Sequence, residues 1–557
     1  MKERDEGSVC FTDNDQIDRL LNKPISDLRE FTEEQLGHIR QLTRIGTALS
    51  AERNIDRLLE MIVDEARRYT HADGGTLYIM SDDEMALHFA IVQNDTLNVR
   101  MGGTSGKITW QPVMLKNHDG SPNYANVSAY SAISGEVVNI PDVYNASGFN
   151  FEGTKKFDAE TNYRSRSMLV VPMRNHESDI IGVLQLLNAL DPVTGEVITF
   201  SLESQRMTES LASQAAVALS NNRLIYDLEN LLESFIKTIA MAIDEKSPYT
   251  GGHVRRVADL TIAIARKINE AAEGPYADVY FNEDQMKELR IAAWLHDVGK
   301  ITTPEYIIDK ATKLETICDR IEILKTRFEV IKRDHQIELL KRGIVREGGS
   351  GGGVVLAEDD EFIKALEEEF NFLVAVNVGG EYMADEMIKR LKSVARRQYV
   401  LDGKTEPLLS DNEIYNLSIR RGTLTEEERG TINNHAAVTQ KMVSQLPFPK
   451  KLRHVSDYAS AHHEKLDGTG YPSGLKGDQL SLQSRILALA DVFEALTAKD
   501  RPYKKGKTLS EVMKIMELMV KDHHIDSHLF DLLIKERIYL DYAQKELTPQ
   551  QVEEIEL

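Results

Sequence analysis

Residues 462–472 read HHEKLDGTGYP, and residues 296–300 read HDVGK. Both strings lie in a C-terminal half whose apolar residues recur every three or four positions, which is typical of helices. Each string places histidine close to aspartate and glycine. The sequence therefore predicts a helical bundle that gathers histidine and carboxylate side chains.

These side chains have the chemistry of a metal centre. Neighbouring residues on a helix point about 100° apart, so His296 and Asp297 can approach one ion from two sides, and His462 and His463 can serve two ions. Imidazole and carboxylate without thiolate favour iron, manganese or zinc at a catalytic site. Two such ions lower the pKa of a shared water and bind the phosphate oxygens of an in-line displacement. The ligand types predict metal-assisted hydrolysis of a phosphoester.

The two strings, with RILALADVFEALTAKDRPYKK at 485–505, resemble the HD-GYP subclass of the HD phosphohydrolases, bacterial phosphodiesterases that open cyclic di-GMP. The resemblance implies catalytic roles for Asp297 and for Lys300, which would stabilise charge on the scissile phosphate. It implies these metal ligands: His253, His296, Asp297, His435, His462, His463 and Asp491. It also identifies the loop that names the subclass, which contains Asp467, Gly468, Gly470, Tyr471 and Pro472, the last two with structural packing as an alternative role.

The chain departs from the family in its expected metal count. Members with a third metal carry a glutamate four residues before the first histidine, where this chain has Tyr249. A phenol, with a reference pKa near 10, replaces a carboxylate poorly. We therefore expect two divalent metal ions per chain, iron or manganese with zinc as the alternative, and linear pGpG rather than GMP as the main product. Glu494 stands where the family more often has aspartate, and it keeps the charge.

A second departure is an insertion at 316–421. A family stretch that follows HDVGK appears here twice in part, as IIDKATKLE at 307–315 and RRGTLTEEE at 420–428. Helical patterning on both sides of GGSGGG at 348–353, a flexible composition, predicts an inserted helical arm. Gating of the site, partner binding and extension of a dimer are alternative roles.

Charge limits the partners of the chain. Its 557 residues carry 67 basic and 89 acidic side chains, a formal net charge of −22, which repels nucleic acid and anionic membranes. The segment KDRPYKKGK at 499–507 is a basic exception. Arg485, Arg501, Tyr503 and Lys504 are the expected contacts to the dinucleotide, with a solvated turn as the alternative.

The N-terminal half has a different pattern. An amphipathic helical stretch at 37–70 precedes β-like runs at 74–80, 86–92, 136–140, 167–173 and 180–188, and a helix follows near Ser201, which predicts an α+β module. HADGGTLYIM, SAISGEVVNIPDVY and FDAETNYRSRSMLVVPM resemble GAF sensor domains, with an antiparallel sheet flanked by helices. The ligand is an unknown small molecule: residues around Phe157–Pro172 resemble cyclic-nucleotide-binding members, but Asn188-Ala189 replaces their usual Asn-Lys. A GAF domain used only for dimerisation is the alternative.

A long helix is expected to join the two halves and to form the seam of a homodimer. The expected seam residues are Leu211, Ala215, Ala218, Asn222, Ile225, Leu232, Ile236 and Ile239. The alternative is a helix packed on its own domain. The predicted order is a polar leader (1–36), a GAF domain (37–222), a connecting helix (223–245), a catalytic domain (246–545) and an acidic tail (546–557).

Two cysteines far apart, no signal peptide and no apolar run long enough for a membrane span predict a cytoplasmic protein. The leading hypothesis is a GAF-regulated, dimeric phosphodiesterase that hydrolyses cyclic di-GMP. Two alternatives are hydrolysis of another cyclic dinucleotide or nucleotide, and a receptor or adaptor that binds cyclic di-GMP without cleaving it. No nucleic-acid-binding motif is present.

Overall fold

The computed structural model divides into two compact units, residues 1–230 and 231–557, which we describe separately. The residues described are 28, 32–33, 36–37, 40, 42–246, 251–341, 346–347, 354–355, 361–380, 382–498 and 506–552. Helix α5 (Leu202–Asp244) crosses the boundary between the units. Within these described residues, no helix is both long and apolar enough to cross a bilayer.

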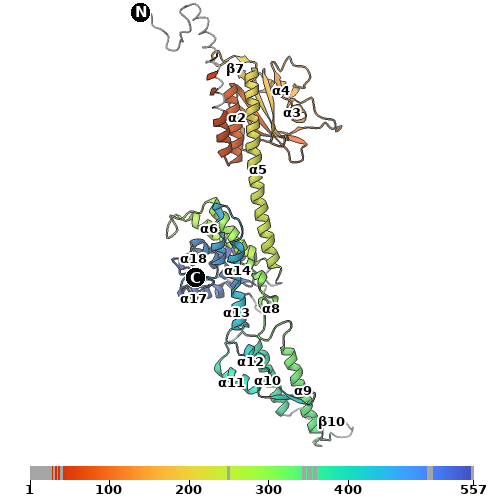
Figure 1. Ribbon diagram of the computed structural model, residues 1–557, viewed down its shortest axis with the longest axis vertical. Coiled ribbons are helices and arrows are strands. Elements are labelled where there is room, and N and C mark those ends of the chain that lie inside the picture. The colour runs from red at the N-terminus through yellow and green to blue at the C-terminus, as the bar shows by residue number, and fades with distance from the viewer. Residues whose placement is uncertain are drawn as a thin grey trace, which may run out of the picture. The chain divides into compact units, whose positions relative to one another are not determined.

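The N-terminal unit is built on one antiparallel sheet, which contains β7 (Figure 1). Its strand order is β3-β2-β1-β7-β6-β5. Short strands β4 and β8 pair with β2 and β7. The sheet contains β1 (Ala72–Met80), β2 (Ala86–Asn94), β3 (Val99–Gly102), β4 (Val113–Met114), β5 (Val138–Ile140), β6 (Met168–Arg174), β7 (Ile180–Leu190) and β8 (Val197–Ile198). All five predicted runs are strands, whereas β3, β4 and β8 are too short to give a clear alternating pattern.

Two hydrophobic cores cover the two faces of this sheet. On one face, α2 (Ile55–Thr70) and the first half of α5 pack Ile62 and Ala215 against Leu184. On the other face, α3 (Val127–Ser134) packs Ala129 against Val170, and α4 (Glu152–Thr161) follows in the chain. The α+β architecture expected of the N-terminal half is therefore confirmed.

The C-terminal unit, residues 231–557, is mostly helical. Its main core joins Leu260 and Ile264 to Leu489, Phe493 and Val512. Its helices outside the insertion are α6 (His253–Glu270), α7 (Glu283–Leu295), η2 (Val298–Thr302), α8 (Glu305–Ile308), α13 (Glu426–Asn433), α14 (His435–Val443), η3 (Lys450–Leu452), α15 (Val455–Ser460), α16 (Leu482–Thr497), α17 (Leu509–Lys521), α18 (Ser527–Lys535) and α19 (Ile538–Glu546). Capping boxes begin α7, α13 and α17, since Asn282, Thr425 and Thr508 each exchange hydrogen bonds with the residue three positions later.

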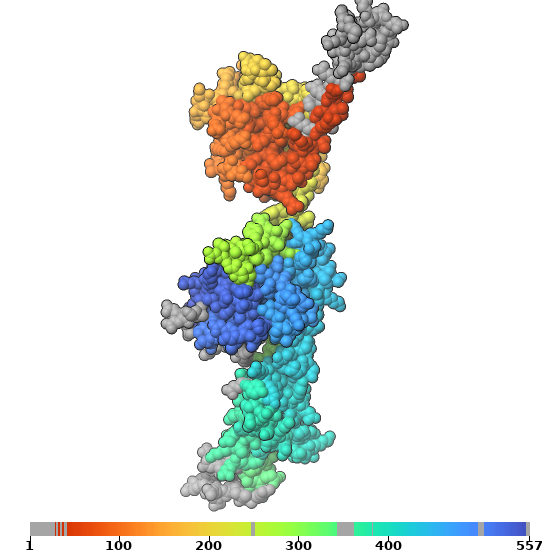
Figure 2. Space-filling model, turned by 90° about the vertical axis from the view of Figure 1, so that its left-hand side faces the viewer, coloured from red at the N-terminus to blue at the C-terminus, as the bar shows by residue number. Residues whose placement is uncertain are grey.

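The insertion has a core of its own, which includes Leu324, Phe328, Leu373 and Leu391. Its described elements are α9 (Ile321–Lys341), β9 (Arg346–Glu347), β10 (Val354–Val355), α10 (Glu361–Asn377), α11 (Asp385–Val394), β11 (Gln398–Leu401), β12 (Lys404–Pro407) and α12 (Asp411–Leu417). They gather in one packed body, coloured green to cyan in Figure 2. The insertion is helical, as expected, and it also carries two small hairpins that the sequence did not predict. The GGSGGG segment lies outside the described residues.

Helix α5 differs from its prediction in one respect. Leu211, Ala215 and Ala218 are buried in the core of the N-terminal unit, and Ile236 is buried in the C-terminal unit. Asn222 donates to the backbone oxygens of Ala218 and Glu52. Ile225, Leu228, Leu232, Phe235 and Ile239 are exposed and follow a heptad spacing, and Leu224, Tyr226, Leu231 and Met241 of the same helix are exposed outside that spacing. The predicted seam was therefore wrong for Leu211, Ala215, Ala218 and Ile236, because the cores of the two units use those residues, and it stays a prediction for Ile225, Leu232 and Ile239.

Candidate metal centre

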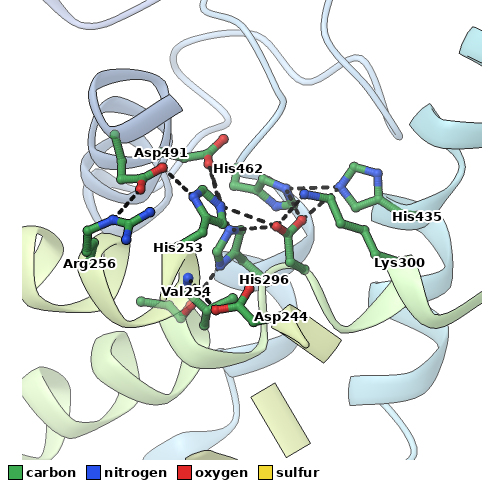
Figure 3. A network of polar contacts seen from close by, with 12 residues as sticks. Asp244, His253, Val254, Arg256, His296, Lys300, His435, His462 and Asp491 are labelled. Carbon is green, nitrogen blue, oxygen red and sulfur yellow. Dashed lines mark hydrogen bonds and ion pairs between the residues drawn. The ribbon is translucent and has the colours of Figure 1, made fainter. Parts of the chain in front are cut away.

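All seven predicted metal ligands meet in the C-terminal unit. His253 begins α6, His296 ends α7, and Asp297 immediately precedes η2. His435 begins α14, while His462 and His463 follow α15, and Asp491 lies within α16. Helix ends therefore supply most of the cluster, and segments nearly 240 residues apart in sequence converge on it (Figure 3).

Asp297 lies at the centre of this cluster. Its Oδ2 atom is 3.4 Å from the Nε2 atoms of both His253 and His296. Its Oδ1 atom is 3.3 Å from His435 Nε2 and 3.9 Å from His462 Nε2. One carboxylate therefore faces two separate groups of imidazoles.

Asp491 contacts His253 and His296, which face one oxygen of Asp297, and it also lies near His463. Its Oδ1 atom is 3.4 Å from His253 Nε2 and 3.8 Å from His296 Nε2, and its Oδ2 atom is 3.9 Å from His463 Nδ1. The resulting triads are His253, His296 and Asp491 on one side and His435, His462 and His463 on the other, and the ligand atoms of each triad lie within 4.8 Å of one another.

Backbone carbonyls orient three of the imidazoles. The Nδ1 atoms of His296, His435 and His462 are 2.7, 2.5 and 2.6 Å from the carbonyl oxygens three residues earlier. A carbonyl oxygen only accepts, so Nδ1 carries the proton in each ring. The unprotonated Nε2 atoms then face the cluster, which is the arrangement of a histidine ligand.

His253 is oriented by a side chain instead. Its Nδ1 atom forms a short contact with Glu494, whose other oxygen accepts a 2.6 Å hydrogen bond from Arg256 Nε. Burial lowers the pKa of His253, but the Glu494 charge and the cluster carboxylates outweigh it and raise that pKa well above its ordinary value. Glu494 thus orients the His253 ring through its Nδ1 atom, on the side of the ring away from the cluster.

The buried donor atoms fit divalent cations. Among the described residues, His253 Nε2, His296 Nε2 and Asp297 Oδ1 are buried without a hydrogen-bond partner. Unpaired buried polar atoms are costly, and these three converge in one place. Burial would raise the pKa of Asp297, but Lys300 and the imidazoles hold it well below its ordinary value. Burial lowers the pKa of His463 to about 4, so this ring is neutral near pH 7. The Asp297 carboxylate and the His463 ring thus have the charge states that metal ligands require.

One side of the cluster is open. The His463 and Lys300 side chains are 28% and 23% exposed, whereas the His296 and His462 side chains are fully buried. Lys300 Nζ is 2.5 Å from Asp297 Oδ2. A ligand from solvent would therefore meet His463 and Lys300 first.

The loop that follows the paired histidines covers part of this opening. The Tyr471 ring lies 4.9 Å from the His463 ring, and Pro472 follows it. At Gly470 a Cβ atom would come within 2.4 Å of the Lys465 nitrogen, and Gly468 has φ of +83°, so both positions require glycine. Asp467 accepts hydrogen bonds from Thr469. Tyr471 packs against a cluster histidine, and Asp467 stabilises the turn.

Of the four predicted substrate contacts, Arg485 is the one that lies within the described residues. Arg485 Nη1 donates to Asp526 at 2.6 Å, which ties α16 to the start of α18. Arg501, Tyr503 and Lys504 lie outside the described residues, as does Tyr249, so the structure says nothing of the basic turn or of the third-metal position.

Three supporting residues were missed by the sequence analysis. Glu494 was noted only for its charge. Glu464, in the quoted HHEK string, accepts hydrogen bonds from the backbone nitrogens of residues 473–475 and so shapes the loop. Thr439 accepts from Gly299 N and donates to the His296 carbonyl, at 3.0 and 2.9 Å. No signal in the sequence marks Thr439, because its role depends on two helices meeting.

Comparison with family models agrees with this arrangement. Residues 54–219 match the GAF domain, and residues 250–353 and 411–529 match HD domains. The chain therefore combines a GAF domain with a following HD domain. The two HD matches are separated by residues 354–410, which lie in the insertion.

Curated relatives match in the HD region. A 3′3′-cGAMP-specific phosphodiesterase of Vibrio cholerae is 42% identical over 114 residues, which cover 20% of this chain and 26% of that protein. A probable cyclic di-GMP phosphodiesterase of Vibrio cholerae is 36% identical over 136 residues, 23% of this chain and 30% of that protein. A cyclic di-GMP phosphodiesterase of Pseudomonas aeruginosa is 38% identical over 114 residues, which cover 20% of this chain and 26% of that protein. The chain thus spans less than a third of the length of these relatives.

Among solved structures, the GAF domain of an Acinetobacter phosphoenolpyruvate-protein phosphotransferase is 13% identical, with a TM-score of 0.26. The match covers 34% of this chain and 97% of that domain.

Proposed function

We propose that the chain is a metal-dependent phosphodiesterase that hydrolyses cyclic di-GMP, mainly to linear pGpG. The observation that carries this proposal is the pair of ligand triads on either side of Asp297, with buried donor atoms left unpaired. The names of the HD-region relatives support a cyclic dinucleotide as the substrate class.

Two ions fit the donor set. His253, His296 and Asp491 would hold one ion, and His435, His462 and His463 would hold the other, with one oxygen of Asp297 toward each. Divalent iron or manganese, with zinc as the alternative, would act as Lewis acid and activate water at this site.

The chain's own residues have distinct tasks in this mechanism. Lys300, at the open side, would donate to a non-bridging phosphate oxygen and stabilise the charge that develops there. Asp297 holds the Lys300 ammonium at 2.5 Å and so orients it. Tyr471 shields His463 from solvent on one side. Attack on phosphorus breaks one P–O ester bond and leaves the second phosphodiester intact in pGpG.

The N-terminal GAF domain is proposed to regulate this activity by binding a small ligand, with a cyclic nucleotide as one candidate class. We further propose that the chain is a homodimer. The supporting feature is the exposed apolar stripe on α5 from Ile225 to Ile239, which repeats at heptad spacing.

The test is anaerobic purification, metal counting and chromatography of the products from cyclic di-GMP, 3′3′-cGAMP and cyclic di-AMP. We expect two metals per chain and pGpG as the main product. Faster cleavage of another dinucleotide would favour the related-substrate alternative. Tight cyclic di-GMP binding without turnover in any metal would favour the receptor, and three metals per chain would contradict the role inferred from Tyr249.

A further inference from the structure

The end of helix α5 makes polar contacts with the segments that carry the cluster. Lys246, just after α5, donates from Nζ to three backbone oxygens: those of Lys300 at 3.2 Å, Ile301 at 2.7 Å and Thr303 at 2.6 Å. Lys246, η2 and the cluster all belong to the catalytic unit. One ammonium therefore holds the turn that contains Lys300.

This contact provides hydrogen-bond donors to backbone oxygens at the end of the short helix η2 (Val298–Thr302). The last carbonyls of a helix have no partner within it, and they carry partial negative charge. A lysine ammonium offers three donors, and here they are directed to the oxygens of Lys300 and Ile301 in the last turn of η2 and of Thr303, its C-cap residue; the Lys300 oxygen also accepts from Thr303 N at 3.0 Å. Lys246 thus acts as a C-terminal cap supplied by another helix, and it fixes the backbone from which the Lys300 side chain reaches Asp297.

Asp244, the last residue of α5, has the complementary role at α6. Its Oδ2 atom accepts a 3.1 Å hydrogen bond from Val254 N, next to His253. The N-cap residue of α6 is Gly252, which has no side chain to provide that bond. Asp244 is buried, and Figure 3 shows it beside Val254, below the histidines. The Asp244 carboxylate therefore caps the start of α6, and the Lys246 ammonium caps the end of η2.

Apolar packing places the same part of α5 against the cluster's supports. Ile236 and Ile243 are buried in a core with Leu295 and Val298, the residues on either side of His296 and Asp297. The last two turns of α5 thus contact the backbone on both sides of the HD pair, as well as the start of α6.

We propose that Lys246 is a positioning residue that aligns Lys300 with the phosphate, with Asp244 doing the same for His253, so that the position of α5 controls the catalytic rate. This inference rests on the proposed phosphodiesterase function. The first half of α5 belongs to the core of the GAF unit, so a shift of this continuous helix would reach the η2 backbone through Lys246.

The test compares Lys246→Met, which keeps the aliphatic chain, with Lys246→Arg and with Glu245→Gln, a neighbouring exposed residue, in the full-length protein. In Lys246→Met we expect two metals per chain, an unchanged KM for cyclic di-GMP and kcat lower by about tenfold, since small misplacements of a catalytic group cost that much or more. Lys246→Arg should retain most of the rate, and Glu245→Gln all of it.

A double-mutant cycle with Lys300→Met separates positioning from a general loss of structure. If Lys246 acts through Lys300, adding Lys246→Met to Lys300→Met lowers kcat no further. An equal tenfold fall in both backgrounds would overturn the proposal, as would a Lys246→Met enzyme of full activity.

Hydrogen exchange supplies a readout that does not depend on turnover. Lys246→Met should increase amide exchange in residues 298–304 at least several-fold, while exchange in α17, a helix of the same unit, stays the same. Unchanged exchange in 298–304 would overturn the proposal. If the wild-type protein cleaves no cyclic dinucleotide, the proposed function fails, and the exchange measurement still decides whether Lys246 fixes η2.

Discussion

Two clusters of buried polar groups, one in each unit, differ in how their atoms are paired. In the GAF unit, Asp73 accepts hydrogen bonds from Tyr163 at 2.5 Å and from Thr96 at 2.7 Å, and Asn188 bonds to Tyr163 and to the backbone of residues 164 and 166. In the catalytic unit, His253 Nε2, His296 Nε2 and Asp297 Oδ1 are buried, close together and unpaired. The polar atoms of the Asp73 network are hydrogen-bonded to one another. The unpaired atoms around Asp297 instead have the chemistry of a site that binds a cation.

The kind of atom matters more than the lack of a partner. Arg67 Nε in the GAF unit is also buried without a partner, but a guanidinium has no lone pair with which to bind a metal. The unpaired atoms of the cluster are imidazole nitrogens and a carboxylate oxygen, all of which are metal donors, whereas the other buried atoms described in the same unit without a hydrogen-bond partner, Thr261 Oγ1, Arg290 Nε and Arg485 Nε, do not belong to the cluster. Convergence of donor atoms thus distinguishes the candidate site from an isolated packing defect.

Removing the central donors should have the largest effect. His296→Ala combined with Asp297→Ala deletes one triad ligand and the carboxylate that faces both triads, so we expect loss of bound metal and a fall in turnover of at least about 10³-fold. Metal analysis and product chromatography measure this. His528→Ala, an exposed histidine of the same unit, is the matched control and should behave as wild type. Full activity in the double variant would contradict the assignment of the site.

Removing the Lys300 ammonium, which lies at the open side of the cluster, should separate metal binding from catalysis. Lys300→Met takes away a donor directed to developing charge, so we expect kcat to fall by about 10²–10³-fold. Two metals per chain should remain, because Lys300 is not a donor to the metals. A variant that loses metal together with activity would show that Lys300 stabilises the cluster rather than the reaction.

Glu494 should control the affinity of the first triad. Glu494→Gln removes the charge behind His253, and loss of such a supporting carboxylate costs about 10–100-fold in metal affinity. Competition with a chelator dye measures it. Glu494→Asp keeps the charge, so it should bind more tightly than Glu494→Gln. Equal affinities for the two variants would argue against a role for that charge.

Metal removal should affect only one of the two units. Ions present at 100 times their dissociation constant stabilise the folded form by about 2.7 kcal/mol each, and chelation removes that stabilisation. Scanning calorimetry should show the transition of the catalytic unit moving to lower temperature while that of the GAF unit stays in place. A shift of both transitions would indicate that the cations do not act through this cluster alone.

A change in the hydrogen-bond network around Asp73 in the GAF unit should have the smallest effect. Tyr163→Phe removes the hydrogen bond to Asp73, and such a loss costs about 1 kcal/mol of unfolding free energy. Thermal unfolding of the GAF unit measures it, and the metal content should not change. Loss of metal in Tyr163→Phe would contradict the comparison between the units.

The sequence predicted much of this arrangement because its signals are local. HDVGK and HHEKLDGTGYP contain four of the seven cluster residues, and alternating runs marked the longer strands of the sheet. The remaining features depend on contacts between distant elements. Burial of Leu211 and Ala215 requires the sheet to be present, and the bond from Glu494 to His253 spans 241 residues. Periodicity shows that a helix has an apolar face, but not which partner covers that face.

The joint at the base of the insertion has a consequence for how such chains change over time. Lys310 Nζ is 2.8 and 2.7 Å from the two oxygens of Glu428, and Thr423 donates to the Lys310 carbonyl at 3.0 Å. The chain thus leaves the helical bundle and returns to it at one place. Closing a loop between fixed ends costs only about 0.6 kcal/mol more for each doubling of its length. Inserted domains of very different size can therefore be exchanged at this joint during evolution, while the metal ligands on either side of it keep their positions.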